Sequence, residues 1–345
     1  MTTRTLAAKR RCAFTEAELA TINDIGKQPF SAFFNAMLCT AGVAAPFVEL
    51  GLPDSVLCEL LVDTAVAMPT VLTDTRLREF RLDGLIQVRT RSGDTELAYV
   101  IAEHKSSPER LVAVQLLEYL SAVYSWWIKR PESEGKKLPK VNLIVVYHGD
   151  VPWNVPLTFG ELVEGGQTKP DVVREAVQAT GAAPLPLNFG FCLIDLNRMS
   201  IETMSMNPEL KAGLLALKYV KQGEKAVEGL PAIMQALVEA KAIRKYVMAL
   251  LTKFKCSRNL IVEELRKAMP EEEDNMMTVE EQIRAEERAL EAVRTKSDVL
   301  MRQLRKRFRR VPEADQQRIR RAQASDLDRW LDQFAVAKNL REALA

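Results

Sequence analysis

Two short stretches decide the fold of this 345-residue chain: RLDGLIQV at residues 81–88 and LAYVIAEHKSS at residues 97–107. The first is rich in aliphatic and β-branched residues, as strands are. The second begins with a continuous apolar run, 97–102, that has the length of a buried strand. Between them, Ser92-Gly93-Asp94 supplies turn residues. We therefore predict a hairpin of two strands in the core of an α/β domain.

Polar side chains follow the apolar run at the end of the second strand. Because alternate residues of a strand share a face, Glu103 and Lys105 lie on one face and His104 on the other. Asp83 opens the neighbouring strand, so its carboxylate can approach Glu103 across the pair. Two adjacent carboxylates repel each other unless a cation lies between them. Mg²⁺ favours oxygen ligands, so we predict that Asp83 and Glu103 hold Mg²⁺ or Mn²⁺.

This arrangement predicts a chemistry. Hydrolysis of a phosphodiester requires a nucleophilic water and neutralisation of the charge that builds up on phosphorus, and a carboxylate-held metal provides both. A lysine beside the water can orient or deprotonate it and offset the developing charge. Because burial lowers the pKa of a lysine, Lys105 could act as the base. Asp83, Glu103 and Lys105 are thus the predicted catalytic residues.

A predicted helix after the second strand carries QLLEY at residues 115–119. Ser107 and Pro108 have the character of an N-cap and a first helical residue. Gln115 and Tyr119 are four residues apart and share an otherwise apolar helix face. An amide on such a face needs a hydrogen-bond partner, so we predict Gln115 as a catalytic residue and Tyr119 as a supporting one.

Ordinary features can explain each part separately. An aspartate before a strand is usually a turn residue, and Glu103 and Lys105 could form an ion pair at a sheet edge. The ordered combination of Asp, hairpin, ExK and QxxxY is more specific than any part. Among the other residues, we expect His104 to lie in the core and Trp126 and Trp127 to pack there. We expect His148 to lie in a loop, with only a weak case for contact with phosphate, and Trp153 to be exposed.

Composition narrows the class of protein. The chain is 47% hydrophobic and 27% charged, which is typical of a globular protein. No apolar stretch has the length of a membrane helix, and the basic N-terminus is not followed by a signal-like apolar segment, so we expect a cytoplasmic protein without a membrane partner. Its five cysteines are widely spaced without CxxC pairs, which argues against a disulfide framework or a thiolate zinc site.

The positive charge is concentrated near the C-terminus. Residues 296–321 contain ten Lys/Arg and three Asp/Glu, a local net charge of +7, whereas the whole chain carries +2. Such a block can contact phosphate or can be a solvated helix face. The residues that we predict as nucleic-acid contacts are Arg305, Lys306, Arg307, Arg309 and Arg310.

Periodicity and capping signals predict the remaining elements. A capping box at Thr15–Glu18 precedes a short helix, and the chain is all helical from about Glu209. Further helices are expected at about 30–37, 55–67, 107–129, 234–254, 278–310 (after a second capping box) and from Ser325, with strands at 141–147 and 189–196.

The order D…ExK…QxxxY resembles the PD-(D/E)xK nuclease superfamily. More narrowly, residues 30–195 resemble the recombination-promoting nuclease / putative transposase family, through RLDGL, IAEHKSS, QLLEYL and LPKVNLIVVYHGDVPW. The resemblance implies a Mg²⁺-dependent DNA endonuclease that promotes recombination. By motif position it implies metal ligands at Asp83 and Glu103, a catalytic Lys105 and a supporting Gln115.

The chain departs from that family at two places. Many members have glutamine at the position of Lys105, and the usual His-Asp pair near the start of the domain has no clear match around residues 28–30. The final segment, which begins with LMRQLRKRF at Leu300, resembles an uncharacterised C-terminal domain.

These observations together predict an α/β PD-(D/E)xK restriction-endonuclease-like core, a mixed sheet flanked by helices, followed by an all-helical C-terminal region. The predicted segments are a basic tail with a short helix (1–25), the nuclease-like domain (26–200), a helical linker region (201–275) and a basic helical domain (276–345). The predicted function is Mg²⁺-dependent DNA cleavage in recombination or mobile elements. Alternatives are an inactive nuclease-fold DNA-binding or transposase-accessory protein and a helical interaction protein. Homo-oligomerisation through the C-terminal helices is a further expectation.

Overall fold

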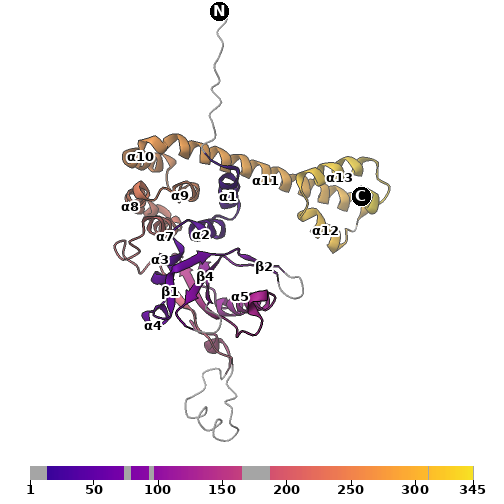
Figure 1. Cartoon of the computed structure of the whole chain (residues 1–345). Coiled ribbons are helices and arrows are strands. Elements are labelled where there is room, and N and C mark those ends of the chain that lie inside the picture. Colours follow the sequence, from indigo (N-terminus) through magenta and orange to yellow (C-terminus); the bar gives the residue numbers. More distant parts are fainter. Residues whose placement is uncertain (1–13, 74–78, 93–96, 165–186, 310, 345) are drawn as a thin grey trace, which may run out of the picture. The chain divides into compact units, whose positions relative to one another are not determined.

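The computed structural model describes residues 14–73, 79–92, 97–164, 187–309 and 311–344. They divide into two compact units between Val279 and Glu280. The first contains a sheet and its covering helices, and the second is helical (Figure 1). The segment boundaries predicted at 25, 200 and 275 remain predictions.

A five-stranded mixed sheet forms the centre of the first unit, with the order β1-β4-β5-β6-β7. Strands β1, β4 and β5 are antiparallel, and β6 and β7 run parallel to β5. Their bounds are Leu60–Ala67 (β1), Gly84–Thr90 (β4), Leu97–Lys105 (β5), Lys140–Tyr147 (β6) and Cys192–Asp195 (β7). A separate two-stranded ribbon pairs β2 (Val71–Thr73) with β3 (Glu79–Arg81). The predicted fold class is confirmed: a mixed sheet with helices, followed by a helical C-terminal region.

Strand β5 is the most deeply buried part of the sheet, because helices cover both of its faces. Tyr99 and Ile101 belong to a core cluster with helix α5 (Val112–Trp127). Helix α2 (Pro29–Cys39) contacts β5 on the opposite face, and α3 (Ala44–Gly51) contacts β1 and β7. Residues 98–102 have no measurable exposure, which explains the continuous apolar run in the sequence.

The N-terminal helices differ in part from expectation. The predicted capping box at Thr15 and Glu18 is confirmed at the start of α1 (Glu16–Lys27). The helix predicted over 55–67 is wrong, because only one turn forms (α4, Asp54–Leu57) before β1 begins. The apolar pattern of the segment LLVDTAVA suits either a helix or a strand. Its pairing with β4 makes it a strand.

Helix α5 starts later than predicted. Ser107 is not its N-cap, since the helix begins at Val112 and residues 106–111 form a loop. In that loop the Glu109 carboxylate pairs with the Lys105 amine at the end of β5. This contact holds the loop beside the strand end, so the first helical turn forms only after it.

The described residues of the first unit also form the helices α7 (Pro208–Val220), α8 (Ala226–Glu239), α9 (Arg244–Leu251) and α10 (Arg258–Ala268). The continuous segment predicted over 234–254 is wrong, because α8 and α9 are separate helices. The Arg244 side chain donates to the carbonyls of Leu237 and Val238, which closes the end of α8. The Glu209 carboxylate accepts from the backbone at Ala242 and Ile243, just before α9.

The helix predicted to begin near Thr278 also starts earlier. Helix α11 spans Glu273–Phe308, and the Thr278 hydroxyl donates to the Asp274 carbonyl inside it. The predicted end of this helix at about residue 310 agrees with its end at Phe308. Helices α12 (Glu313–Arg320), α13 (Ala324–Val336) and α14 (Leu340–Ala343) follow and share a small core with α11. The short 3-10 helices are η1 (Pro131–Ser133), η2 (Phe159–Leu162), η3 (Gly223–Lys225) and η4 (Pro270–Glu272).

In the described part of the chain, no helix is on its own both long and apolar enough to cross a membrane; only α2 and α3 taken together satisfy that test, as a pair bent by 109°. The cysteines in that part, Cys39, Cys58, Cys192 and Cys256, are free thiols. The basic tail, the turn at Gly93-Asp94 and Cys12 lie outside the described residues.

Candidate active site

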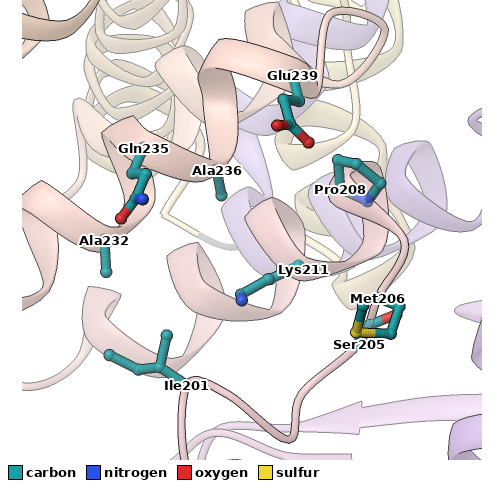
Figure 2. Close-up of a pocket in the computed structure, with 9 residues that line it drawn as sticks. All are labelled: Ile201, Ser205, Met206, Pro208, Lys211, Ala232, Gln235, Ala236 and Glu239. Carbon is teal, nitrogen blue, oxygen red and sulfur yellow. The ribbon is translucent and has the colours of Figure 1, made fainter.

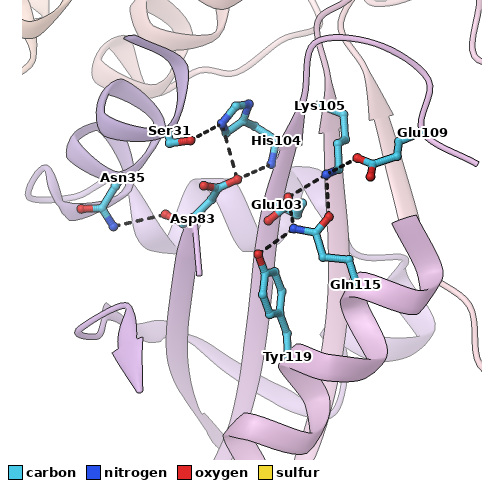
Figure 3. A network of polar contacts seen from close by, with 9 residues as sticks. All are labelled: Ser31, Asn35, Asp83, Glu103, His104, Lys105, Glu109, Gln115 and Tyr119. Atoms are coloured by element: carbon cyan, nitrogen blue, oxygen red, sulfur yellow. Dashed lines mark hydrogen bonds and ion pairs between the residues drawn. The ribbon is translucent and has the colours of Figure 1, made fainter. Parts of the chain in front are cut away.

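The candidate site lies where β4 begins and β5 ends. Gly84 pairs with Ala102 in the antiparallel register, so Asp83 and Glu103 are neighbours just beyond that pair. Glu103 and Lys105 point from β5 towards α5, and the Asp83 carboxylate lies next to that of Glu103 (Figure 3). The structure therefore brings Asp83, Glu103 and Lys105 together, as the alternation along the strand predicts.

The Lys105 amine contacts three oxygen atoms. It lies 3.0 Å from Glu103 Oε1 and 2.7 Å from Glu109 Oε2, and it donates to Gln115 Oε1 at 2.6 Å. Burial opposes the charge of Lys105, but the carboxylates of Glu103 and Glu109 outweigh it and raise the pKa of the lysine. This direction is opposite to the lowering that burial alone would cause, so the two carboxylates favour the ammonium form of Lys105. A role for Lys105 as a base stays a prediction.

Gln115 connects the lysine to the buried carboxylate. Its amide nitrogen donates to Glu103 Oε1 at 2.8 Å and lies 2.6 Å from the Tyr119 hydroxyl oxygen. Burial, with a further contribution from the charge of Glu103, raises the pKa of Tyr119, so this hydroxyl keeps its proton. Both helix residues predicted for the site thus belong to its hydrogen-bond network (Figure 3).

Asp83 is held by groups on the other side of β5. Its carboxylate accepts from the His104 backbone at 3.3 Å and lies 3.5 Å from His104 Nε2. The same ring nitrogen is 3.0 Å from the Ser31 hydroxyl, and the Asn35 amide donates to the Asp83 carbonyl at 3.2 Å. His104 points to the face opposite Glu103, as alternation along the strand predicts, and its ring is part of a hydrogen-bond network. It still contacts Asp83, because Asp83 lies at the strand end and reaches that face.

Electrostatic strain is concentrated on Glu103, whose side chain is only 4% exposed. Burial and repulsion from Asp83 raise its pKa to about 8, although the ion pair with Lys105 acts in the opposite direction. Glu103 Oε2 is buried without a hydrogen-bond partner among the described residues. A buried acceptor without a donor is costly.

The residues present fit a divalent cation. An ion between Asp83 and Glu103 would relieve their repulsion and give Glu103 Oε2 a partner. Among the described residues there is no group of three or more His, Cys, Asp or Glu side chains arranged to hold a metal. A site with two carboxylates suits Mg²⁺, which commonly binds one or two protein carboxylates and retains several waters.

Gly84 allows Asp83 to lie this deep. A Cβ atom at Gly84 would overlap Leu38 Cδ1 of α2 and would approach Ala102 Cβ to 3.2 Å. Strand β4 can therefore contact α2 closely only with glycine at this position.

We expect Gly84→Ala to lower the free energy of unfolding by about 1–3 kcal/mol, the usual cost of overpacking, because Leu38 must move. Urea denaturation followed by circular dichroism measures this difference. Gly190→Ala is the matched control, since a Cβ there would meet only ordinary contacts at 3.4 and 3.5 Å. An equal loss in both variants would contradict the role given to Gly84.

Three side chains considered from the sequence have structural roles. Trp127 is buried, as expected. Trp153 is not an exposed loop aromatic, because it packs against Tyr147 and Phe191 with ring centroids 5.1 and 6.2 Å away. His148 follows β6 as expected but is fully buried, so it cannot reach a phosphate at the surface.

The predicted basic contacts lie in the second unit. Arg305, Lys306, Arg307 and Arg309 are exposed at the end of α11, and Arg310 lies outside the described residues. Arg307 donates to the Phe334 carbonyl and lies 5.2 Å from the Phe334 ring centroid, so it also holds α11 against α13.

Sequence reasoning missed three residues of the network. Ser31 and Asn35 are on α2, 73 and 48 residues away from the groups that they contact, and no local pattern indicates that proximity. Glu109 could have been found, because it lies four residues after Lys105 with the opposite charge.

Comparison with known proteins shows the family of the chain. The family model described as "Putative transposase, YhgA-like" matches residues 28–248. "Recombination-promoting nuclease RpnD" of Escherichia coli O157:H7 is 26% identical over 268 residues, which cover 74% of this chain and 94% of that protein. "Inactive recombination-promoting nuclease-like protein RpnE" of Escherichia coli strain K12 is 23% identical over 269 residues, 75% of this chain and 82% of that protein.

A shorter relative from strain K12, "Putative inactive recombination-promoting nuclease-like protein YjiP", is 34% identical over 97 residues, 28% of this chain and 91% of its own length. No solved structure matches the chain. The family match spans more than half of the chain and includes all of the clustered residues from Asp83 to Tyr119. The chain therefore belongs to the YhgA-like transposase family.

Proposed function

We propose that this protein is a Mg²⁺-dependent DNA endonuclease that hydrolyses phosphodiester bonds in recombination or in mobile elements. The observation that carries the proposal is the buried Glu103 carboxylate, whose Oε2 faces no donor among the described residues while Asp83 adjoins it. The similarity to a protein named as a recombination-promoting nuclease supports the same reaction class. The compartment proposed for this function is the cytoplasm.

Each residue of the network has a task in this proposal. Gln115 and Lys105 occupy Glu103 Oε1, which leaves Oε2 for the ion. Tyr119 fixes the Gln115 amide, and His104 fixes Asp83. Bound Mg²⁺ would supply a nucleophilic water and neutralise phosphate charge. Lys105 would orient that water and offset negative charge in the transition state.

A second function is a catalytically inactive DNA-binding or transposase-accessory protein on the same fold. Two of the similar proteins are named as inactive, which favours this alternative. Nicking of supercoiled plasmid by the purified full chain, with Mg²⁺ and with EDTA, separates the two. Mg²⁺-dependent nicking supports the nuclease, and salt-sensitive binding without nicking supports the alternative.

We also propose that the basic end of α11 contacts DNA phosphates. Replacing Arg305, Lys306 and Arg309 together by glutamine should flatten the salt dependence of DNA affinity, by a slope of about one per lost contact. Arg307 is left intact because it anchors α13. The control replaces Lys129, Lys136 and Lys137, which precede β6 at the other end of the strands. Fluorescence anisotropy over a salt series measures both slopes, and equal slopes would identify the α11 residues as a solvated face.

The same C-terminal helices are the proposed contact for a homo-oligomer. Light scattering of the full chain and of a truncation before Glu280 compares their masses, and an unchanged oligomeric state on truncation would refute this contact.

A further inference from the structure

A cavity of about 410 Å³ adjoins Asp83 on the side away from Lys105. Its walls come from the junction of α1 and α2, from the start of β2 and from the segment that leads from β3 to Asp83. Lys27, Gln28 and Arg81 are exposed at this cavity. Ser31 and Asn35, which hold Asp83 and His104, line it on the α2 side (Figure 3).

The chemistry of the lining indicates the class of ligand. Lys27 and Arg81 provide two cations, and Gln28, Asn35 and Thr70 provide neutral donors. Aromatic side chains are absent from the described residues of this lining, so it offers no platform for a stacked base. Cations and neutral donors without a stacking surface are the groups that contact a nucleic-acid backbone.

We propose that this cavity, called the groove from here on, holds the sugar–phosphate backbone of the DNA strand beside the scissile phosphate. Lys27 and Arg81 each contact a phosphate of that strand. This inference rests on the proposed nuclease function and names where the strand lies. Asp24 and Asp83 balance the two cations in the lining. A divalent ion at Asp83 would make the groove net positive, so metal should strengthen DNA binding there.

Two further cations lie close to the site but outside this lining. Lys105 is paired with Glu103 and Glu109. The Lys221 amine lies 3.5 Å from the Ser106 carbonyl and 5.8 Å from the centre of the Phe30 ring. A strand that reaches Asp83 through the groove would pass Lys27 and Arg81, which line it.

The other cavities offer less. The pocket between α7 and α8, of about 250 Å³, combines one cation, Lys211, with one acid, Glu239, beside the exposed Met206 (Figure 2). In a third cavity, of about 190 Å³, Arg244 and Lys245 are each ion-paired with a glutamate of the lining. Neither pocket adjoins the candidate metal carboxylates.

The test measures binding of the full chain to a fluorescein-labelled DNA duplex in Ca²⁺, with a salt series for each variant. Arg81→Gln and Lys27→Gln should each weaken binding and reduce the slope of log K against log salt by about 0.9. Arg81→Lys should restore the slope, because it keeps the charge. Lys211→Gln, in the pocket of Figure 2, is the matched control and should bind like wild type. All three changed residues are surface cations, and thermal melting verifies the fold.

The proposal that the groove binds DNA would be overturned if Arg81→Gln and Lys27→Gln had the same salt slope as Lys211→Gln. The outcome is independent of cleavage. If the variants show the expected slopes but the wild-type chain never cleaves DNA, the groove stands as a DNA-binding site and only the nuclease function is refuted. If the wild-type chain cleaves DNA but the variants leave the slope unchanged, the nuclease function stands and the groove is refuted.

Discussion

Glu103→Gln and Asp83→Asn should each abolish Mg²⁺-dependent cleavage of plasmid DNA and leave DNA affinity close to that of wild type. Each change removes a negative oxygen from the proposed metal site without changing the size of the side chain. A metal contributes several kcal/mol to stabilisation of the transition state, so we expect a loss of at least about 1,000-fold, or about 4 kcal/mol. Binding survives because it depends on phosphate contacts distributed over the protein.

The measurements are the initial rate of nicking and, separately, the dissociation constant for DNA in EDTA, where no metal contributes to binding. Glu109→Gln is the matched control, because its carboxylate pairs with Lys105 on the side away from Asp83 (Figure 3). We expect that variant to retain most of its activity. Full cleavage by both Glu103→Gln and Asp83→Asn would show that the nuclease activity does not arise at this site.

Lys105→Met should slow cleavage by about two to four orders of magnitude, the range for a positioned catalytic group, without weakening metal binding. The reason is charge: Lys105 is an ammonium held by Glu103 and Glu109, and methionine has a similar length without charge or donors. The measurement is the nicking rate at saturating Mg²⁺, compared with the metal dissociation constant of the same variant.

Lys105→Gln separates two roles of the lysine. Glutamine can still donate a hydrogen bond to a water but carries no charge, so we expect activity between wild type and Lys105→Met. Equal rates in all three proteins would show that Lys105 pairs with Glu103 for structure only. A drop in metal affinity as large as the drop in rate would make the lysine a positioning residue for Glu103.

The sequence predicts the centre of the site well because its signals are local. The run LAYVIAEHK fixes a buried strand, its alternation places Glu103 with Lys105, and the four-residue spacing places Gln115 with Tyr119. Each of these inferences depends on the geometry of one element. The hairpin adds Asp83, because the antiparallel register follows from adjacency in the chain.

The errors arise where distant contacts override local preference. LLVDTAVA has an apolar pattern that suits a helix or a strand, and its pairing with β4 decides for the strand. Thr278 resembles an N-cap, yet it lies inside α11, since the residues before it also form helix.

The surroundings of Asp83 could not be predicted from the sequence either, because they depend on contacts between segments that are far apart in the chain. Strand alternation correctly places His104 on the face opposite Glu103, but alternation does not apply to Asp83, which precedes β4. Its contacts with His104 and Asn35 depend on how α2 packs against the sheet. Glu103 is the main cause of the raised pKa of Lys105, and Glu109 adds to it from a place that depends on the course of the loop after β5.

The central claim is that Asp83 and Glu103 hold one divalent ion, and Mn²⁺ binding to the full chain tests it most directly. Electron paramagnetic resonance of free Mn²⁺ gives the affinity of wild type, Glu103→Gln and Glu109→Gln, whatever their activity. We expect a single bound ion in wild type and in Glu109→Gln, and at least about a tenfold weaker affinity in Glu103→Gln. Equal Mn²⁺ affinity in Glu103→Gln and wild type, or no binding by wild type, would contradict the central claim.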